Sequence, residues 1–276
     1  MSPSETAGTT ALYWATSVVL CMTITHDGLT VSWLGYATAR LEAPDGTVVY
    51  TDPGRYGTLE GTWADQYGDA PHPSGPAYDA QDGDVVVVTH DHHYDSDGVE
   101  RVASEDATIV VYEDVSAERI TDGGRDVVEP ESLPYDIERV GYGDTLSVAG
   151  VDIDVIPAYN LPDGPNAPNG EPIHPEGLGC GFVLTLEGTR CFWTGDSDVI
   201  DEQQDLEVSL FMPSIAQNYT MDRHDAADLA ETLEPDLVLP IHYNTFAELE
   251  ADSTAFAGDV ASRGIPVVLD EGSLEH

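Results

Sequence analysis

One imbalance of charge constrains this chain more than any other feature of its sequence. Its 276 residues include 52 acidic and 9 basic residues, a formal net charge of −43, and every basic residue is an arginine. A folded chain this acidic repels itself in dilute buffer, whereas at about 1 M salt the Debye length is roughly 3 Å and most of the repulsion is screened. Because 41% of the residues are hydrophobic and recur in strong apolar segments, the chain is not an acidic disordered polymer. The sequence predicts a folded protein of a salt-rich cytoplasm, such as that of extreme halophiles.

The same charge excludes several classes of partner. The sequence has no basic stripe that could meet phosphates, so we expect no binding to nucleic acid or to an anionic membrane. We expect a small-molecule substrate instead, and the residues leave open whether the protein forms a homo-oligomer. Cys21, Cys180 and Cys191 form neither an even framework nor a CxxC pair, which favours buried thiols in the reducing cytoplasm.

The first residues of the chain read differently from the rest. The apolar stretch from Ala11 to Cys21 is too short to span a bilayer, and no Lys or Arg precedes Arg40 to form the positive region of a secretory signal. At Met22 the sequence reads like an ordinary cytosolic start that leads into a strand. We therefore expect residues 1–21 to be a dispensable extension and residues 22–276 to be a single domain.

Strand-like and helix-like patterns alternate along the chain. The patterns predict strands over residues 29–34, 37–43, 47–51, 85–88, 109–112, 144–148, 151–157, 181–186, 190–193, 209–212, 237–240 and 265–269. They predict helices over residues 97–104, 222–233 and 247–263, and irregular loops over 55–83 and 161–179. Each half is rich in strands and ends in helices, which predicts an α/β (α+β) sandwich of two mixed sheets with helices outside. There are too few strand–helix alternations for an α/β barrel.

Four of these predicted strands end in side chains that can bind a metal. They are followed by Asp52, by the turn that runs from His90 to Asp95, by Asp196 and by His242. Strand ends fix the position of each Cα while the loops stay free to shape a pocket. Singly, Asp196 could be a turn or cap residue and His242 a hydrogen-bonded core histidine. Together they predict a metal site.

The turn after the valine run carries the strongest signal. Three of the nine histidines, His90, His92 and His93, fall within four residues, and the first two can reach one ion from a tight turn. Imidazole and carboxylate ligands without cysteine suit zinc, with manganese or iron as alternatives. Asp196 could bridge two ions, which would make a two-metal site.

Seven short segments, in order along the chain, are typical of one family. They are WLGYAT (33–38), YTDPG (50–54), VTHDH (88–92), TGD (194–196), MP (212–213), YTMD (219–222) and PIHYNTF (240–246). From about residue 29 to 270 the chain resembles the metallo-β-lactamase superfamily, most closely the branch with ascorbate-6-phosphate lactonase-like proteins and related metal-dependent hydrolases. The resemblance implies a four-layer αββα sandwich with its metals at one edge.

The chain departs from the family pattern HxHxDH, in which two histidines bind one ion and the following Asp and His bind the other. Without a gap, Tyr94 takes the Asp position and Asp95 the last His position; with one inserted residue, Asp95 matches the Asp and Ser96 replaces the His. Either alignment lacks one histidine. A further family histidine is expected near residues 157–160, where the chain has none.

The resemblance nevertheless allows a full set of roles to be assigned. Two histidines, His93 in the turn and His174 in the loop 161–179, are expected to supply the missing imidazoles. Asp95 is expected to be an acidic ligand and a general base, and Asp52 to accept from a ligand imidazole and fix its tautomer. The expected metal ligands are His90, His92, His93, Asp95, His174, Asp196 and His242.

These residues favour a metal-dependent hydrolase, with two zinc ions as the expected cofactor. In this interpretation a metal-bound hydroxide attacks the carbonyl carbon of a lactone or other ester, or the phosphorus of a phosphodiester. The scarcity of arginine favours a neutral substrate. Two alternatives stay open: a non-catalytic relative with a degenerate one-ion site, and an iron-dependent redox enzyme on the same fold.

The charge generates a first testable prediction. Raising KCl from a low to a molar concentration should raise the Tm of the protein, because salt screens the mutual repulsion of its carboxylates. Thermal unfolding followed by circular dichroism measures this effect. A Tm that does not change over that range would contradict the interpretation of the acidic surface as an adaptation to salt.

Overall fold

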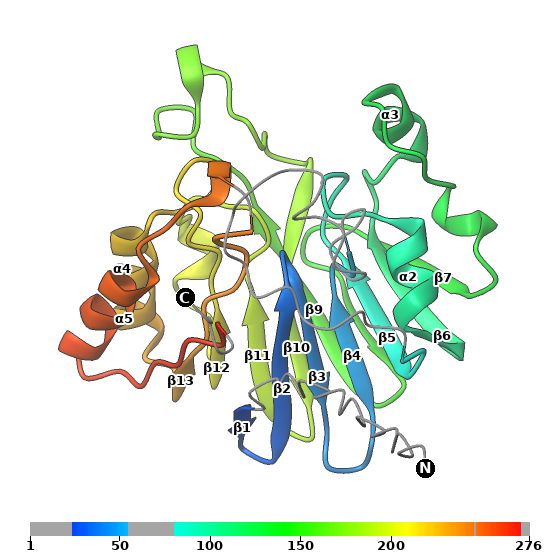
Figure 1. The fold of residues 1–276 in the computed structure, drawn as a ribbon, viewed down its shortest axis with the longest axis horizontal. Coiled ribbons are helices and arrows are strands. Elements are labelled where there is room, and N and C mark those ends of the chain that lie inside the picture. The colour runs from blue at the N-terminus through cyan, green and yellow to red at the C-terminus, as the bar shows by residue number, and fades with distance from the viewer. Residues whose placement is uncertain (1–23, 55–79, 246, 272–276) are drawn as a thin grey trace, which may run out of the picture.

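Two mixed β-sheets form the centre of the molecule (Figure 1). The computed structural model describes residues 24–54, 80–245 and 247–271, so the predicted extension 1–21 and most of the predicted loop 55–83 lie outside the described residues. Within these ranges one sheet has seven strands and the other has six.

The first sheet follows the chain order. It contains β1 (Ile24–His26), β2 (Leu29–Gly35), β3 (Thr38–Glu42), β4 (Val48–Thr51), β5 (Gly83–Val88), β6 (Ala103–Tyr112) and β7 (Asp136–Val140). Strands β1 to β4 pair antiparallel through short turns, whereas β4 to β7 pair parallel. The valine run of β5 is therefore held between two parallel neighbours, and Val85 to Val88 are all fully buried.

The second sheet repeats this plan. Its strands in spatial order are β13 (Leu237–Val238), β12 (Leu210–Met212), β11 (Thr189–Trp193), β10 (Gly179–Leu186), β9 (Val151–Ala158) and β8 (Thr145–Val148). Strands β8 to β11 are antiparallel, and β11 to β13 are parallel. The β10–β11 hairpin turns at Glu187 and Gly188, whose φ angles of 49° and 86° suit a two-residue hairpin turn.

Helices lie on both sides of the stacked sheets. Figure 1 shows α4 (Arg223–Leu233) and α5 (Ser253–Ser262) at one side, and α2 (Ser96–Val102) and α3 (Ala117–Asp122) at the other. Short 3-10 turns occur at Pro130–Ser132, Pro168–Gly170, Asp201–Gln203 and Ala247–Leu249. This arrangement confirms the predicted four-layer αββα sandwich.

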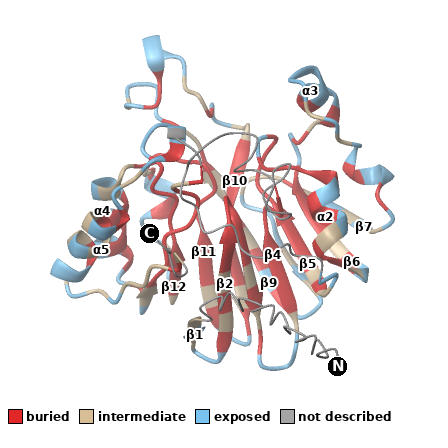
Figure 2. Ribbon diagram, in the orientation of Figure 1, coloured by how far each residue is buried: buried red, intermediate tan, exposed pale blue. Residues whose placement is uncertain are grey.

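The core lies between the two sheets. Large side chains of the second sheet, among them Phe182, Phe192, Trp193 and Phe211, are fully buried. The Phe192 and Phe211 rings stack with their centroids 5.7 Å apart. Figure 2 shows the buried residues concentrated along the strands and the exposed ones on the outer faces of the helices. Cys180 and Cys191 are buried, free thiols, as expected.

Several predicted element boundaries were right, whereas the prediction of one continuous last helix was wrong. Helix α4 begins after Asp222, whose side chain accepts from the backbone N–H groups of His224 and Asp225 as an N-cap does. The helix predicted over 247–263 is broken, because the Asn244 side chain bonds both backbone groups of Ala251 and Asp252 then caps a new helix. The strand predicted over 265–269 is a single bridge between Val238 and Val267.

No element was predicted between Tyr112 and Asp144, where the structure has α3 and β7. Helix α3 has six residues and β7 has five, so neither is long enough to show a clear period in the sequence. Among the described residues, no helix combines the length and the apolar character needed to cross a membrane.

Two helical glycines give a matched stability test. A Cβ added at Gly98 in α2 would lie 2.0 Å from the carbonyl oxygen of Pro53, whereas one added at Gly258 in α5 meets nothing within 4 Å. We expect Gly98→Ala to destabilise the fold by about 1–3 kcal/mol through overpacking against backbone. Gly258→Ala should instead stabilise it by about 0.5–1 kcal/mol, because alanine restricts the unfolded chain.

Urea unfolding in molar KCl measures both free energies of unfolding. Equal effects of the two substitutions would show that α2 does not pack against the Pro53 backbone as described.

Candidate metal centre

Four polar segments meet where strands of the two sheets end. Asp52 follows β4, the turn His90–Asp95 follows Thr89 after β5, Asp196 follows β11, and His242 lies beyond β13. The carboxyl ends of neighbouring parallel strands lie at one edge of a sheet, and ligands bind there in open α/β folds. Asp52 and His242 adopt positive φ angles of 38° and 57°, a strained conformation that functional sites often retain.

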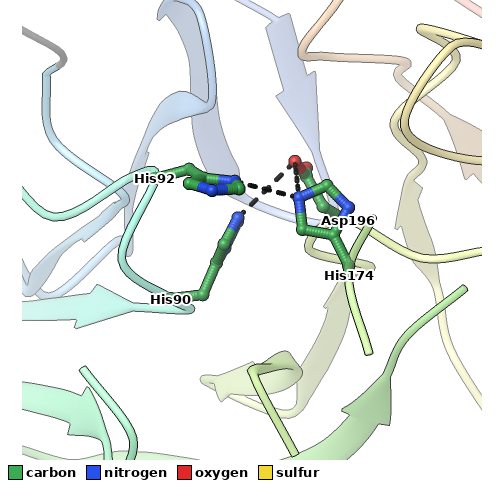
Figure 3. Close-up of side chains that lie close together, drawn as sticks. All are labelled: His90, His92, His174 and Asp196. Carbon is green, nitrogen blue, oxygen red and sulfur yellow. Dashed lines mark hydrogen bonds and ion pairs between the residues drawn. The ribbon is translucent and has the colours of Figure 1, made fainter. Parts of the chain in front are cut away.

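A first cluster contains His90, His92, His174 and Asp196. Figure 3 shows the three imidazoles and the carboxylate pointing toward a common centre. Nδ1 of His92 lies 3.0 Å from Nε2 of His174, and Oδ2 of Asp196 lies 3.4 Å from His174 Nε2 and 3.6 Å from His90 Nε2. His92 is exposed while the other three are buried, so the cluster opens to solvent on the His92 side.

A second cluster contains His93, His242 and the same Asp196, and all three are buried. The two Nε2 atoms of the histidines lie 3.1 Å apart, and Oδ1 of Asp196 lies 3.1 Å from that of His242 and 3.6 Å from that of His93. The Tyr36 ring packs edge-on against both imidazoles, with centroids 5.0 Å and 4.6 Å away.

Asp196 joins the two clusters through its two oxygens. Oδ2 faces His90 and His174, whereas Oδ1 faces His93 and His242. Gly195 makes this position accessible: its φ is +59°, and a Cβ there would lie 2.3 Å from the carbonyl oxygen of Cys180. The carboxylate is thus placed to bridge two ions.

The donor atoms are spaced as metal ligands are. A tetrahedral ion with ligands at about 2.0–2.1 Å separates its donor atoms by about 3.3–3.4 Å, and the distances within the two clusters run from 3.0 to 3.6 Å. His90 Nε2 and Asp196 Oδ1, which both face the clusters, are buried without a hydrogen-bond partner. Such atoms are rare unless something else satisfies them, so the residues fit two cations.

Asp52 orients the imidazole of His93 in the second cluster. Its carboxylate is fully buried, and Oδ2 lies 3.0 Å from Nδ1 of His93. The same oxygen accepts from Trp193 Nε1 at 2.7 Å and from Thr89 Oγ1 at 2.9 Å. A carboxylate that accepts from Nδ1–H leaves Nε2 of His93 unprotonated and aimed at the cluster.

The outer side of the histidine turn is held by arginines. Asp91 points away from both clusters, accepts from Ser116 N at 2.8 Å and pairs with Arg119 Nε. Arg125 donates to the backbone carbonyls of Asp91 and Tyr94. These contacts stabilise the turn that presents three histidines to the site.

Asp95 does not join either cluster. Its Oδ1 accepts from the backbone N–H groups of Asp97 and Gly98, at 3.1 Å and 3.4 Å, and so caps α2. Burial raises the pKa of Asp95. The helix begins immediately after this residue and turns the carboxylate toward its own N-terminus, which sequence alignment does not reveal. The structure brings together the other six predicted ligands.

Burial also sets the protonation of the metal-free site. Desolvation lowers the pKa of His90 well below its usual value, and it also lowers the pKa of His174 and of His242. Burial opposes ionisation of Asp196, but the facing His242 and His93 hold its pKa well below the usual range. Burial therefore favours the neutral forms of His90, His174 and His242, which are the forms that can act as ligands.

Sequence reasoning did not assign roles to Thr89, Trp193, Asn160 or Asp198, which contact the ligands or their partners. Only Thr89 carried a signal, since it stands between the valine run and His90. The others become neighbours of the site through tertiary contacts.

Comparisons with known proteins show what this chain is similar to. Residues 30–242 match the family model described as Beta-lactamase superfamily domain. The chain is 28% identical over 248 residues to the UPF0173 metal-dependent hydrolase of Methanopyrus kandleri, covering 86% of this chain and 94% of that protein. It is also 28% identical to the UPF0173 metal-dependent hydrolase of Archaeoglobus fulgidus, covering 86% and 93%.

A solved structure shares the fold. The metallo hydrolase Igni18 of the hyperthermophilic archaeon Ignicoccus hospitalis superposes with a TM-score of 0.60 at 20% sequence identity, covering 89% of this chain and 96% of that one.

The buried histidines give a pH prediction for the metal-free protein. The pKa values of His90, His174 and His242 are lower in the folded state than in the unfolded chain. Below about pH 6.5 the unfolded state therefore binds more protons than the folded state, and the free energy of unfolding falls as the pH drops. Each histidine contributes at most about 1.4 kcal/mol per pH unit.

Urea unfolding of chelator-treated protein in molar KCl, between pH 8 and 5, measures this slope. His242→Gln should flatten it, whereas His224→Gln, at an exposed histidine of α4, should not. Equal slopes in wild type and His242→Gln would contradict the assignment.

Proposed function

The chain belongs to the beta-lactamase superfamily, and on that basis we propose that it is a hydrolase that holds two divalent metal ions in the two clusters joined by Asp196. The main observation behind this proposal is the orientation of the Asp196 carboxylate, which turns one oxygen toward each group of histidines. A two-metal site commonly shares a bridging ligand of this kind.

The ligand set favours zinc. Four protein ligands would hold one ion, His90, His92, His174 and Asp196, and three would hold the other, His93, His242 and Asp196. Five imidazoles and one carboxylate without thiolate suit zinc, with manganese and iron as alternatives. Asp95 stays outside the proposed set because its oxygen is engaged at the cap of α2.

His93 is what distinguishes this proposal from a degenerate one-ion site. The altered turn lacks a family ligand, yet His93 reaches the second cluster and is oriented there by Asp52. Three protein ligands leave a position open for water or substrate, as in catalytic sites.

Ions bound here would supply Lewis acidity toward a substrate oxygen and toward water. The chain itself positions the ligands and limits access. Asp52 fixes the tautomer of His93, Asp196 holds the two groups at a set distance, and exposed His92 marks the side from which substrate approaches.

The charge of the chain favours an uncharged substrate. A protein with a net charge of −43 repels anions over the range of its field. Among the arginines that the structure describes, Arg119 and Arg125 lie near the turn, but Arg119 pairs with Asp91 and Arg125 donates to the backbone carbonyls of Asp91 and Tyr94. We therefore propose a lactone or another neutral carboxylic ester before a phosphodiester.

Metal content and turnover test this proposal together. Protein purified in molar KCl should contain two equivalents of zinc by elemental analysis and hydrolyse members of a panel of neutral lactones and esters. His92→Ala and His242→Ala should each lower the metal content and reduce kcat/KM by more than about 100-fold, since even the outer partners of ligands are worth 10–100-fold in affinity or activity. His224→Ala is the matched control and should behave as wild type.

One ion per chain with no turnover on any member of the panel would instead support the non-catalytic alternative. Faster hydrolysis of a phosphodiester than of every neutral ester would contradict the proposed substrate class.

A further inference from the structure

His174 joins the first cluster from the loop after β9 and not from the end of a strand, and hydrogen bonds to neighbouring residues hold it there. We propose that Asn160 and Asp198 are positioning residues for His174, forming a chain of hydrogen bonds that protonates its Nδ1 and leaves Nε2 free for a metal ion. This inference rests on the proposed metal centre, but the state that it predicts exists in the metal-free protein.

The two residues belong to different segments. Asn160 lies two residues beyond β9 and opens the loop that carries His174, whereas Asp198 lies two residues beyond Asp196. Both are almost fully buried, at 1% and 6% exposure, as is His174 at 3%. None of these three residues lies in a strand or helix. Hydrogen bonds of their side chains therefore fix their relative positions.

The direction of each hydrogen bond follows from what each group can do. A carboxylate oxygen accepts hydrogen bonds, so the Asn160 atom 3.2 Å from Asp198 Oδ1 is the amide nitrogen. The same nitrogen lies 3.0 Å from the carbonyl oxygen of Tyr219, a second acceptor. The other amide atom must therefore be the oxygen, and the backbone N–H of His174 donates to it at 2.9 Å.

His174 Nδ1 then has acceptors on both sides. It lies 3.2 Å from the Asn160 oxygen and 3.2 Å from the carbonyl oxygen of Tyr219. In the neutral ring only one nitrogen carries a proton, and two facing acceptors place it on Nδ1. The lone pair of Nε2 consequently faces the cluster, where His92 Nδ1 lies 3.0 Å away and can donate to it, whereas the competing acceptor Asp196 Oδ2 lies farther away, at 3.4 Å.

The same network folds the loop. Asp198 Oδ2 accepts from the backbone N–H of Leu161 at 2.8 Å, and its Oδ1 accepts from Asn166 Nδ2 at 2.6 Å. Asn160 N donates to the carbonyl oxygen of His174 at 2.8 Å. The buried carboxylate is therefore surrounded by donors, as a buried charge requires.

Asn166 separates a role in orienting His174 from a role in folding the loop. It bonds the same Asp198 oxygen and the carbonyl oxygen of Thr220, at 2.6 Å and 2.8 Å, and is as buried as Asn160. No contact between its side chain and His174 occurs among the described hydrogen bonds. A substitution there removes loop bonds and leaves the acceptor on His174 Nδ1 in place.

Nitrogen-15 NMR of the metal-free protein in molar KCl near pH 8, with labelled histidine, reads the tautomer directly. The His174 signals are assigned by their loss in His174→Gln. Wild type should show His174 protonated on Nδ1. Asn160→Ala should shift it toward the Nε2–H form, whereas Asn166→Ala should leave it on Nδ1.

Metal affinity gives a second readout. Asn160→Ala should weaken the binding of the first-cluster ion by about 10–100-fold, as loss of an outer partner does, and should change the visible spectrum of bound Co²⁺. Asn166→Ala should change affinity by less than about 3-fold even where it lowers Tm.

Nε2–H His174 in wild type would overturn this inference, whether or not any variant folds, and so would the same tautomer change in both variants. Nδ1–H His174 in a protein that hydrolyses no ester would support this inference while contradicting the proposed function.

Discussion

The carboxylate of Asp52 is fully buried and accepts hydrogen bonds from both sheets. Thr89, which follows β5 of the first sheet, donates its N–H at 2.8 Å and its hydroxyl at 2.9 Å, and Trp193 of β11 in the second sheet donates from Nε1 at 2.7 Å. A charge at this depth is stable only because these donors replace water. The bonds join the two sheets at one point beside the histidine turn, so the position of His93 depends on them.

In both clusters an imidazole is oriented by a hydrogen bond at its Nδ1 atom. His93 meets a carboxylate at Nδ1, and His174 meets the oxygen of an amide that is itself bonded to a carboxylate. In each case a buried acidic residue, outside the ligand set, determines which ring nitrogen keeps its lone pair. Asp196, the carboxylate that both clusters contain, faces both groups of histidines.

Part of the candidate site could be predicted because most of its proposed ligands lie at strand ends that the sequence marks clearly. The valine run of β5, the Gly195–Asp196 turn after β11 and the histidine beyond β13 are visible as local patterns, and parallel strand ends share an edge. The carboxylate of Asp95 could not be placed in this way. Whether it faces an ion or the first turn of α2 depends on where that helix begins, and the helix begins directly after Asp95, which caps it.

The sequence by itself determined the positions of most strands, the cap of α4 at Asp222 and the types of residue available for a metal, because these follow from local periodicity and chemistry. Only the tertiary structure decided that His93 and His174 complete two clusters and that Asn160 and Asp198 hold His174. These residues are separated by as many as 149 positions along the chain, as His93 and His242 are. Contacts over such separations depend on how the two sheets stack and how the loop folds between them, and no local pattern records either.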